Sequence, residues 1–163
     1  MNDDWQKRVD AVWADADNLA EDELIAAIDR LAAERPEGDA LALFERGGAQ
    51  DSTGHPDVAE PLYRAALEAG LPDDERAQCT IQLASSVRNL GRPEETLTLL
   101  HTEFDGRPDS PYAGAAAAIS ALAHASLGRP TEGLVVALHG LADTLPRYQR
   151  SMHAYADALL DED

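Results

Sequence analysis

Apolar and small residues recur along this chain at spacings of three and four, which is the pattern of a buried helix face. One such face precedes a short turn near residue 54 and another follows it. The first face consists of Leu43, Gly47 and Gln50, and the second of Ala59, Tyr63, Ala66 and Leu67. The pattern predicts two helices that flank a tight turn. A similar spacing at Leu24, Ile28 and Leu31 predicts a helix before Pro36.

The turn carries a signal that recurs at a fixed interval. Gly54-His55-Pro56, Gly91-Arg92-Pro93 and Gly128-Arg129-Pro130 share the form Gly-x-Pro, and 91 − 54 and 128 − 91 both equal 37. Glycine suits the left-handed position just past a helix end, and proline suits the first turn of the next helix. Each copy therefore predicts the turn of one helical hairpin, and three copies predict three stacked hairpins.

The boundaries between hairpins follow the same logic. Leu71-Pro72, Arg107-Pro108 and Leu145-Pro146 are expected to end the second helix of each pair. Asp73-Asp74-Glu75 and Asp109-Ser110-Pro111 are then expected to open the next pair, with a capping side chain and negative charge at the positive end of the helix dipole. We assign the acidic triplet to capping and not to metal binding, because adjacent carboxylates on a helix point in different directions.

These hairpins resemble the tetratricopeptide repeat, whose 34-residue pattern places a small residue in the first helix and Ala-x-x-x-aromatic in the second, followed by proline. The first unit matches through Gly47, Ala59, Tyr63 and Ala66, with Pro72 displaced by one position. The second matches through Leu83, Ala84, Leu100 and Pro108, with Thr96 where alanine is usual. The third keeps Ala121, Ala137 and Pro146 but has Gly133 and Gly140 at packing positions.

The resemblance implies an all-α fold, a right-handed superhelical stack of antiparallel helix pairs in one domain over residues 1–163. The expected parts are a divergent N-terminal helix pair (1–36), three repeats (39–72, 73–108 and 110–146) and a C-terminal capping helix (148–160). Because the interval of 37 exceeds 34 by about one helical turn, the first helices of repeats two and three are expected to start early. The chain is similar to small bacterial proteins of this kind without assigned activity.

Composition narrows the class of partner. The 163 residues include 13 Lys and Arg against 31 Asp and Glu, a net charge of −18, so nucleic acid and anionic membrane surfaces would repel the molecule. No apolar run is long enough to span a bilayer, and the acidic start does not resemble a signal peptide. We therefore expect a cytoplasmic protein. The single cysteine, Cys79, is expected to be a small buried residue.

The sequence offers little catalytic chemistry. Gly47-Gly48 is not followed by the Gly-Lys-Ser/Thr of a phosphate loop, and the five histidines do not show zinc spacing. His124 and His139 could lie close together across the third hairpin, but a satisfied or solvent-facing role is favoured for both. We expect no cofactor, no metal and no catalytic residue. A cryptic hydrolase that uses Cys79 or a serine is the remote alternative.

By the resemblance, a protein or peptide partner would bind in a concave groove lined by the first helix of each repeat. The candidate groove residues are Phe44, Gln78, Ile81, Gln82, Ser85, Arg88, Asn89, Ile119 and Leu122. The middle of this set is polar and its end is apolar, which suits a segment with an apolar anchor and a few hydrogen bonds. Phe44, Ile81 and Ala118 stand where relatives that hold acidic chaperone tails often have lysine, so that function is disfavoured.

Two alternatives concern the apolar third repeat. The C-terminal helix could simply cover its surface, because exposed apolar patches of that extent are uncommon on monomers. The third repeat and the C-terminal helix could instead form a homodimer contact, which would make the protein a self-associating structural element.

Overall fold

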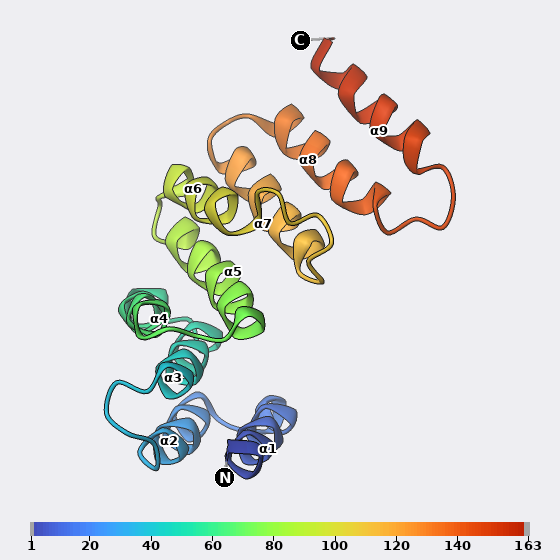
Figure 1. The fold of residues 1–163 in the computed structure, drawn as a ribbon. Coiled ribbons are helices and arrows are strands. Elements are labelled where there is room, and N and C mark those ends of the chain that lie inside the picture. The colour runs from blue at the N-terminus through green and yellow to red at the C-terminus, as the bar shows by residue number, and fades with distance from the viewer. Residues whose placement is uncertain (1, 162–163) are drawn as a thin grey trace. The chain divides into compact units, whose positions relative to one another are not determined.

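The computed structural model describes residues 2–161, which contain helices and loops and no strand (Figure 1). The chain divides into two compact units, Met1–Ser86 and Val87–Asp163, and the division falls within α5. The elements in order are α1 (Asn2–Ala14), the 3-10 turn η1 (Ala16–Asn18), α2 (Glu21–Ala32), α3 (Ala40–Ser52), α4 (Pro56–Ala69), α5 (Asp73–Asn89), α6 (Pro93–Phe104), α7 (Ala113–Ser126), α8 (Pro130–Ala142), α9 (Gln149–Ala158) and the 3-10 turn η2 (Leu159–Asp161). The all-helical, pairwise-packed arrangement predicted from the sequence is confirmed.

In unit 1, the N-terminal pair α1 and α2 packs through apolar residues spaced three and four apart. Trp5 and Val9 on α1 meet Leu24 and Ile28 on α2, and all four are buried. The indole nitrogen of Trp5 donates a hydrogen bond of 2.8 Å to the carbonyl oxygen of Leu31, so the polar atom of this buried ring is satisfied. The core of this pair continues to Ala42 and Ala49 on α3.

Helices α3 and α4 pack closely because a glycine on α3 faces an aromatic ring on α4. A Cβ atom added to Gly47 would lie 2.6 Å from two ring carbons of Tyr63, so no larger residue fits without movement. Tyr63 is fully buried between Ala59 and Ala66 on the inner face of α4. These are the residues that carried the resemblance in the first repeat, and they do form the helix contact.

All three Gly-x-Pro turns have the predicted geometry. Gly54, Gly91 and Gly128 have φ angles of +82°, +83° and +73°, in the left-handed region. Pro56, Pro93 and Pro130 each begin the following helix. In every turn the residue after the glycine donates its N–H to a carbonyl five residues earlier, at 2.9 to 3.1 Å, which satisfies a helix-end carbonyl.

In unit 2, the packing of α7 against α8 depends on glycines in the second helix of the pair. A Cβ atom on Gly133 would lie 2.7 Å from the backbone oxygen of Ala121, and one on Gly140 would lie 2.7 Å from the Cβ of Ala117. The two glycines that weakened the match of the third repeat therefore let its helices approach closely.

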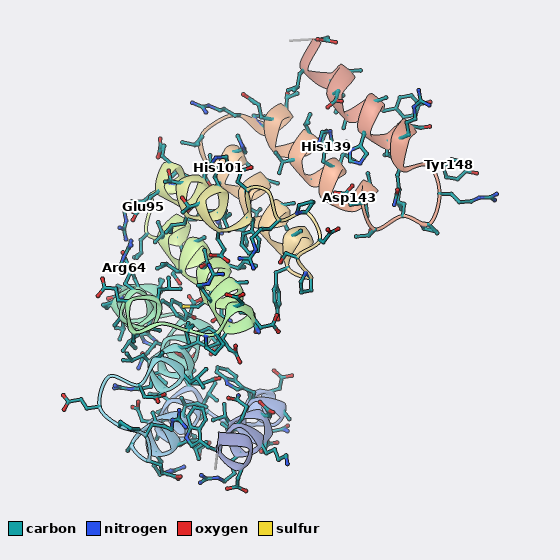
Figure 2. All side chains as sticks on the ribbon, in the orientation of Figure 1. Arg64, Glu95, His101, His139, Asp143 and Tyr148 are labelled. Carbon is teal, nitrogen blue, oxygen red and sulfur yellow. The ribbon has the colours of Figure 1, made fainter. Side chains whose placement is uncertain are left out.

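The C-terminal helix α9 packs on α8, with Ala156 buried in the contact (Figure 1). Two histidines lie close to carboxylates here: Nε2 of His139 is 3.0 Å from Oδ1 of Asp157, and Nε2 of His153 is 3.0 Å from Oδ1 of Asp143, the residue that follows α8. The two imidazole rings meet edge to face at 4.8 Å. His139 thus contacts His153 of α9. The loop before α9 carries Tyr148, which points away from both helices (Figure 2).

The first helix of the second repeat starts early, as expected, but the first helix of the third repeat does not. Helix α5 begins at Asp73 and has 17 residues against 13 in α3, with its acidic triplet in the first turn as predicted. Helix α7 begins only at Ala113 and has 14 residues. The Ser110 hydroxyl accepts a hydrogen bond from the N–H of Tyr112 at 3.3 Å, so residues 109–111 form a turn before the helix and not its first turn.

Replacing Gly47 with alanine should destabilise unit 1 by about 1–3 kcal/mol, because the new methyl group overlaps the Tyr63 ring in a closely packed hairpin. Thermal or urea unfolding of the purified protein measures the change. Gly114→Ala is the matched control, because Gly114 lies in α7 with nothing within 4 Å of its Cβ position, and helix propensity there favours alanine by about 1 kcal/mol. Equal stability of Gly47→Ala and the wild type would contradict the packing.

Candidate functional site

The candidate groove residues of α5 form a mostly polar, half-buried row. In unit 1 these are Gln78, Ile81, Gln82 and Ser85. The amide oxygen of Gln82 accepts a 2.8 Å hydrogen bond from the Tyr63 hydroxyl, so part of its polar capacity is already used inside the protein. In the part of α5 that belongs to unit 2, half-buried Arg88 donates to the side-chain oxygen of exposed Asn89 at 2.8 Å.

Phe44 offers little surface to a partner. Its side chain is 7% exposed, and its ring lies 6.2 Å from the ring of Tyr63 in the hairpin core. Helix α3 is rotated so that Phe44, which was expected in the groove, packs inward. The groove as a whole, which would draw on residues of both units, stays a prediction.

In unit 2, the predicted apolar residues lie on an open face of α7. Leu122 is 47% exposed and Ile119 is half-buried beside it. The exposed stripe of α7 consists of four solvent-exposed residues: Ala115, Ala118, Leu122 and Ala125. Because α9 packs on α8, it leaves this stripe uncovered, which overturns the alternative that the C-terminal helix hides it.

A buried carboxylate in unit 1 was not anticipated from the sequence. Glu45 on α3 is 9% exposed, and its two oxygens accept hydrogen bonds from Nε1 of Trp13 at 2.7 Å and from Nε2 of Gln6 at 3.4 Å. Burial raises the pKa of Glu45, the two hydrogen bonds oppose that rise, and the negative charges of Asp10 and Glu75 add to it. Because both donors are uncharged, no positive charge balances the carboxylate, and keeping Glu45 ionised costs free energy.

A second carboxylate on α3 has a similar environment. Asp51 lies 3.5 Å from the Tyr63 hydroxyl, and burial raises its pKa against the hydrogen bonds from Ser86 and Tyr63. Nothing in the sequence indicated the burial that raises the pKa of Glu45 and of Asp51. Their environments depend on Trp13, Tyr63 and Ser86, which come from three other helices.

The single cysteine, Cys79, occupies a buried structural position. Cys79 is fully buried, and burial raises the pKa of its thiol to about 12, so the sulfur is protonated near neutral pH. Among residues 2–161, no group of three or more His, Cys, Asp or Glu side chains converges on a metal position. In the same residues no helix is long and apolar enough to cross a bilayer.

The fold and the placement of these residues define a protein built from helical hairpins, of which the three after the N-terminal pair have a Gly-x-Pro turn. The family model of the tetratrico peptide repeat matches residues 40–159. The chain belongs to the tetratrico peptide repeat family, whose repeats generally mediate protein–protein interaction. Neither a curated protein nor a solved structure matches the chain.

Glu45→Gln should stabilise the protein at pH 7.5 and have little effect at pH 4. A carboxyl whose pKa is raised by folding destabilises the folded state as the pH rises above the ordinary pKa of glutamate, and the penalty is complete above the raised pKa. Below the ordinary pKa the penalty is absent. Glutamine keeps an acceptor for Trp13 without the charge. Melting temperatures at both pH values measure the difference.

The control for this experiment is Glu34→Gln. Glu34 is exposed and its pKa is lowered by its hydrogen bonds with Arg8, so loss of its charge should not stabilise the protein at pH 7.5. A Glu45→Gln protein that melts at or below the wild-type temperature at pH 7.5 would show that the carboxylate is favourable where it lies.

Proposed function

We propose that this protein is a non-enzymatic, cytoplasmic scaffold that binds an apolar segment of a partner protein through the exposed stripe of α7. The observation that carries the proposal is the stripe itself, an apolar helix face that no other helix of unit 2 covers. Exposed apolar faces of this kind are unusual on a soluble protein without a binding role.

The chemistry of α7 restricts what can dock on it. Residues 113–126 include no Asp, Glu, Lys or Arg. A charged side chain of a partner buried against this face would lose hydration without gaining an opposite charge, which is unfavourable. The alanines let a partner backbone approach closely, and Leu122 is the one large side chain that can enter a recess in the partner.

The polar row of α5 supports the same proposal. Gln78, Ser85, Arg88 and Asn89 are hydrogen-bonding side chains, each half-buried or exposed. Groups of this kind fix the register of a bound segment, whereas the apolar anchor supplies affinity. We propose that Arg88 and Asn89, which belong to unit 2, contact the partner together with Ile119 and Leu122, as the family resemblance implies.

A second candidate function is self-association through α8. Leu134 and Leu141 are 50% and 53% exposed, and a separation of seven residues puts them on one face of that helix. With Tyr155 and Leu160 of the C-terminal segment also exposed, the third repeat and the C-terminal helix offer an apolar surface to a second copy.

Leu122→Arg should weaken partner binding while leaving unit 2 folded. The arginine removes the apolar anchor and introduces a charge that the stripe cannot pair, so the affinity should fall at least tenfold, or about 1.4 kcal/mol. The partner is first identified by cross-linking in cells, and its binding to wild-type and variant protein is then measured by calorimetry. Leu134→Arg is the matched control on α8. Equal loss in both variants, or no loss in Leu122→Arg, contradicts the proposal.

Self-association predicts a molecular mass that depends on protein concentration. If α8 forms a homodimer contact, light scattering over a dilution series should show a mass that falls toward 17.5 kDa as the protein is diluted. Leu134→Arg should then shift the midpoint at least tenfold toward higher concentration, and Leu122→Arg should not. A constant monomer mass at all concentrations excludes this function.

A further inference from the structure

Unit 2 contains a cavity, largely open to solvent, that the partner-binding proposal does not use. It has a volume of about 680 Å³ and lies between α6, α7 and the loop that joins them, with Val136 of α8 at its side. That volume falls within the range of small-molecule sites, about 300–1,000 Å³. Most of its wall is apolar: Leu97, Leu100, Phe104, Pro108, Ala113, Ala116, Ala117 and Val136.

The cavity exists because the facing side chains of α7 are small. Ala113, Ala116, Ala117 and Ser120 recur at intervals of three and four and form one wall, opposite the large side chains of Leu97 and Phe104 on α6. Close packing normally fills such a gap with larger residues. Since 100° separates successive residues on a helix, this wall lies on the opposite side of α7 from the exposed stripe.

One end of the cavity is polar. Ser120 and His124 are one helical turn apart on the α7 wall. Thr98 and His101 line the α6 side (His101 is labelled in Figure 2), and Nε2 of His101 lies 3.6 Å from Oδ2 of Asp105. The Nδ1 atom of His124 is shielded from solvent and has no hydrogen-bond partner among residues 2–161. A shielded nitrogen without a partner is unfavourable, so His124 has an unused hydrogen-bonding atom in the part of α7 that lines the cavity.

The charges around the cavity permit an anionic head group. Arg107 and Asp105 both line the far end, and Arg107 is paired with Glu103. Residues 87–163 carry 11 Asp and Glu against 6 Lys and Arg, whereas residues 1–86 carry 20 against 7. The strong negative charge of the chain therefore resides mainly in unit 1, and imidazole and hydroxyl groups are suitable donors to a carboxylate.

We propose that this cavity binds a medium-chain monocarboxylic acid, with the alkyl chain along the alanine wall of α7 and the carboxylate at Ser120 and His124. From Ala113 to His124 the wall is about 16 Å long, a length that suits an extended chain and exceeds that of a compact ring compound. The ligand displaces water from the apolar wall, which is the source of the binding free energy, and the polar end sets its direction.

The test titrates the full-length protein with decanoate, below its micelle-forming concentration, by isothermal calorimetry. Ser120→Leu fills the cavity from its wall and removes the hydroxyl, so the affinity should fall at least tenfold. Ser126→Leu makes the same change at an exposed position of α7 and should bind within twofold of the wild type. No binding to the wild type, or equal binding by Ser120→Leu, overturns the proposal.

The head group is tested with decanol and with His124→Phe, which keeps the ring and removes both nitrogens. Decanoate should bind the wild type at least tenfold more tightly than decanol, and His124→Phe should remove that preference. Equal affinity for the two ligands overturns the carboxylate assignment.

Histidine NMR signals keep the test decisive if Ser120→Leu does not fold. The protein has five histidines, and decanoate should shift the ring signals of His124 and His101, which line the cavity, and not that of His55 in unit 1. Uniform shifts of all five signals, or none, overturn the proposed site.

Discussion

The contact between Gly47 and the Tyr63 ring is the constraint on which unit 1 depends. With no side chain at Gly47, the ring of Tyr63 can lie directly against the backbone of α3. That position lets the Tyr63 hydroxyl reach Gln82 and its backbone oxygen accept a weak hydrogen bond from the Cys79 thiol at 3.6 Å, both from α5. One glycine therefore sets the spacing of three consecutive helices. The same packing shields Asp51 and so accounts for its raised pKa.

In unit 2 the glycines that allow close helix packing lie on the second helix of the pair, whereas in unit 1 the glycine lies on the first. Gly133 and Gly140 belong to α8, the second helix of its pair, and they meet the backbone of Ala121 and the Cβ of Ala117 on α7. Because α8 supplies the space, α7 does not need a large residue on any face to hold the pair together. This reversal explains why the third repeat matches the family pattern least well although its hairpin is intact.

The sequence predicted what depends on local geometry and missed what depends on neighbours. Glycine and proline restrict the backbone directly, so the three turns and the helix pairs followed from residues such as Gly91 and Pro93. The inward position of Phe44 and the burial of Glu45 depend on how α3 is rotated against α1 and α4, which spacing on one helix does not specify. Helix α7 starts late because the Ser110 hydroxyl accepts a hydrogen bond from the N–H of Tyr112 in a turn before the helix and so does not cap an earlier helix start.

The composition of α7 explains how one helix can be both exposed and bordered by a cavity. Eight of its 14 residues are alanine, the residue with the highest intrinsic helix propensity. A helix of this kind depends less on burial of large side chains than an amphipathic helix does, so faces without packing partners remain compatible with a stable structure. The exposed stripe with Leu122 and the alanine wall opposite Phe104 therefore both follow from the high alanine content of α7. Larger residues on α7 would have filled the space against α6 and removed the cavity.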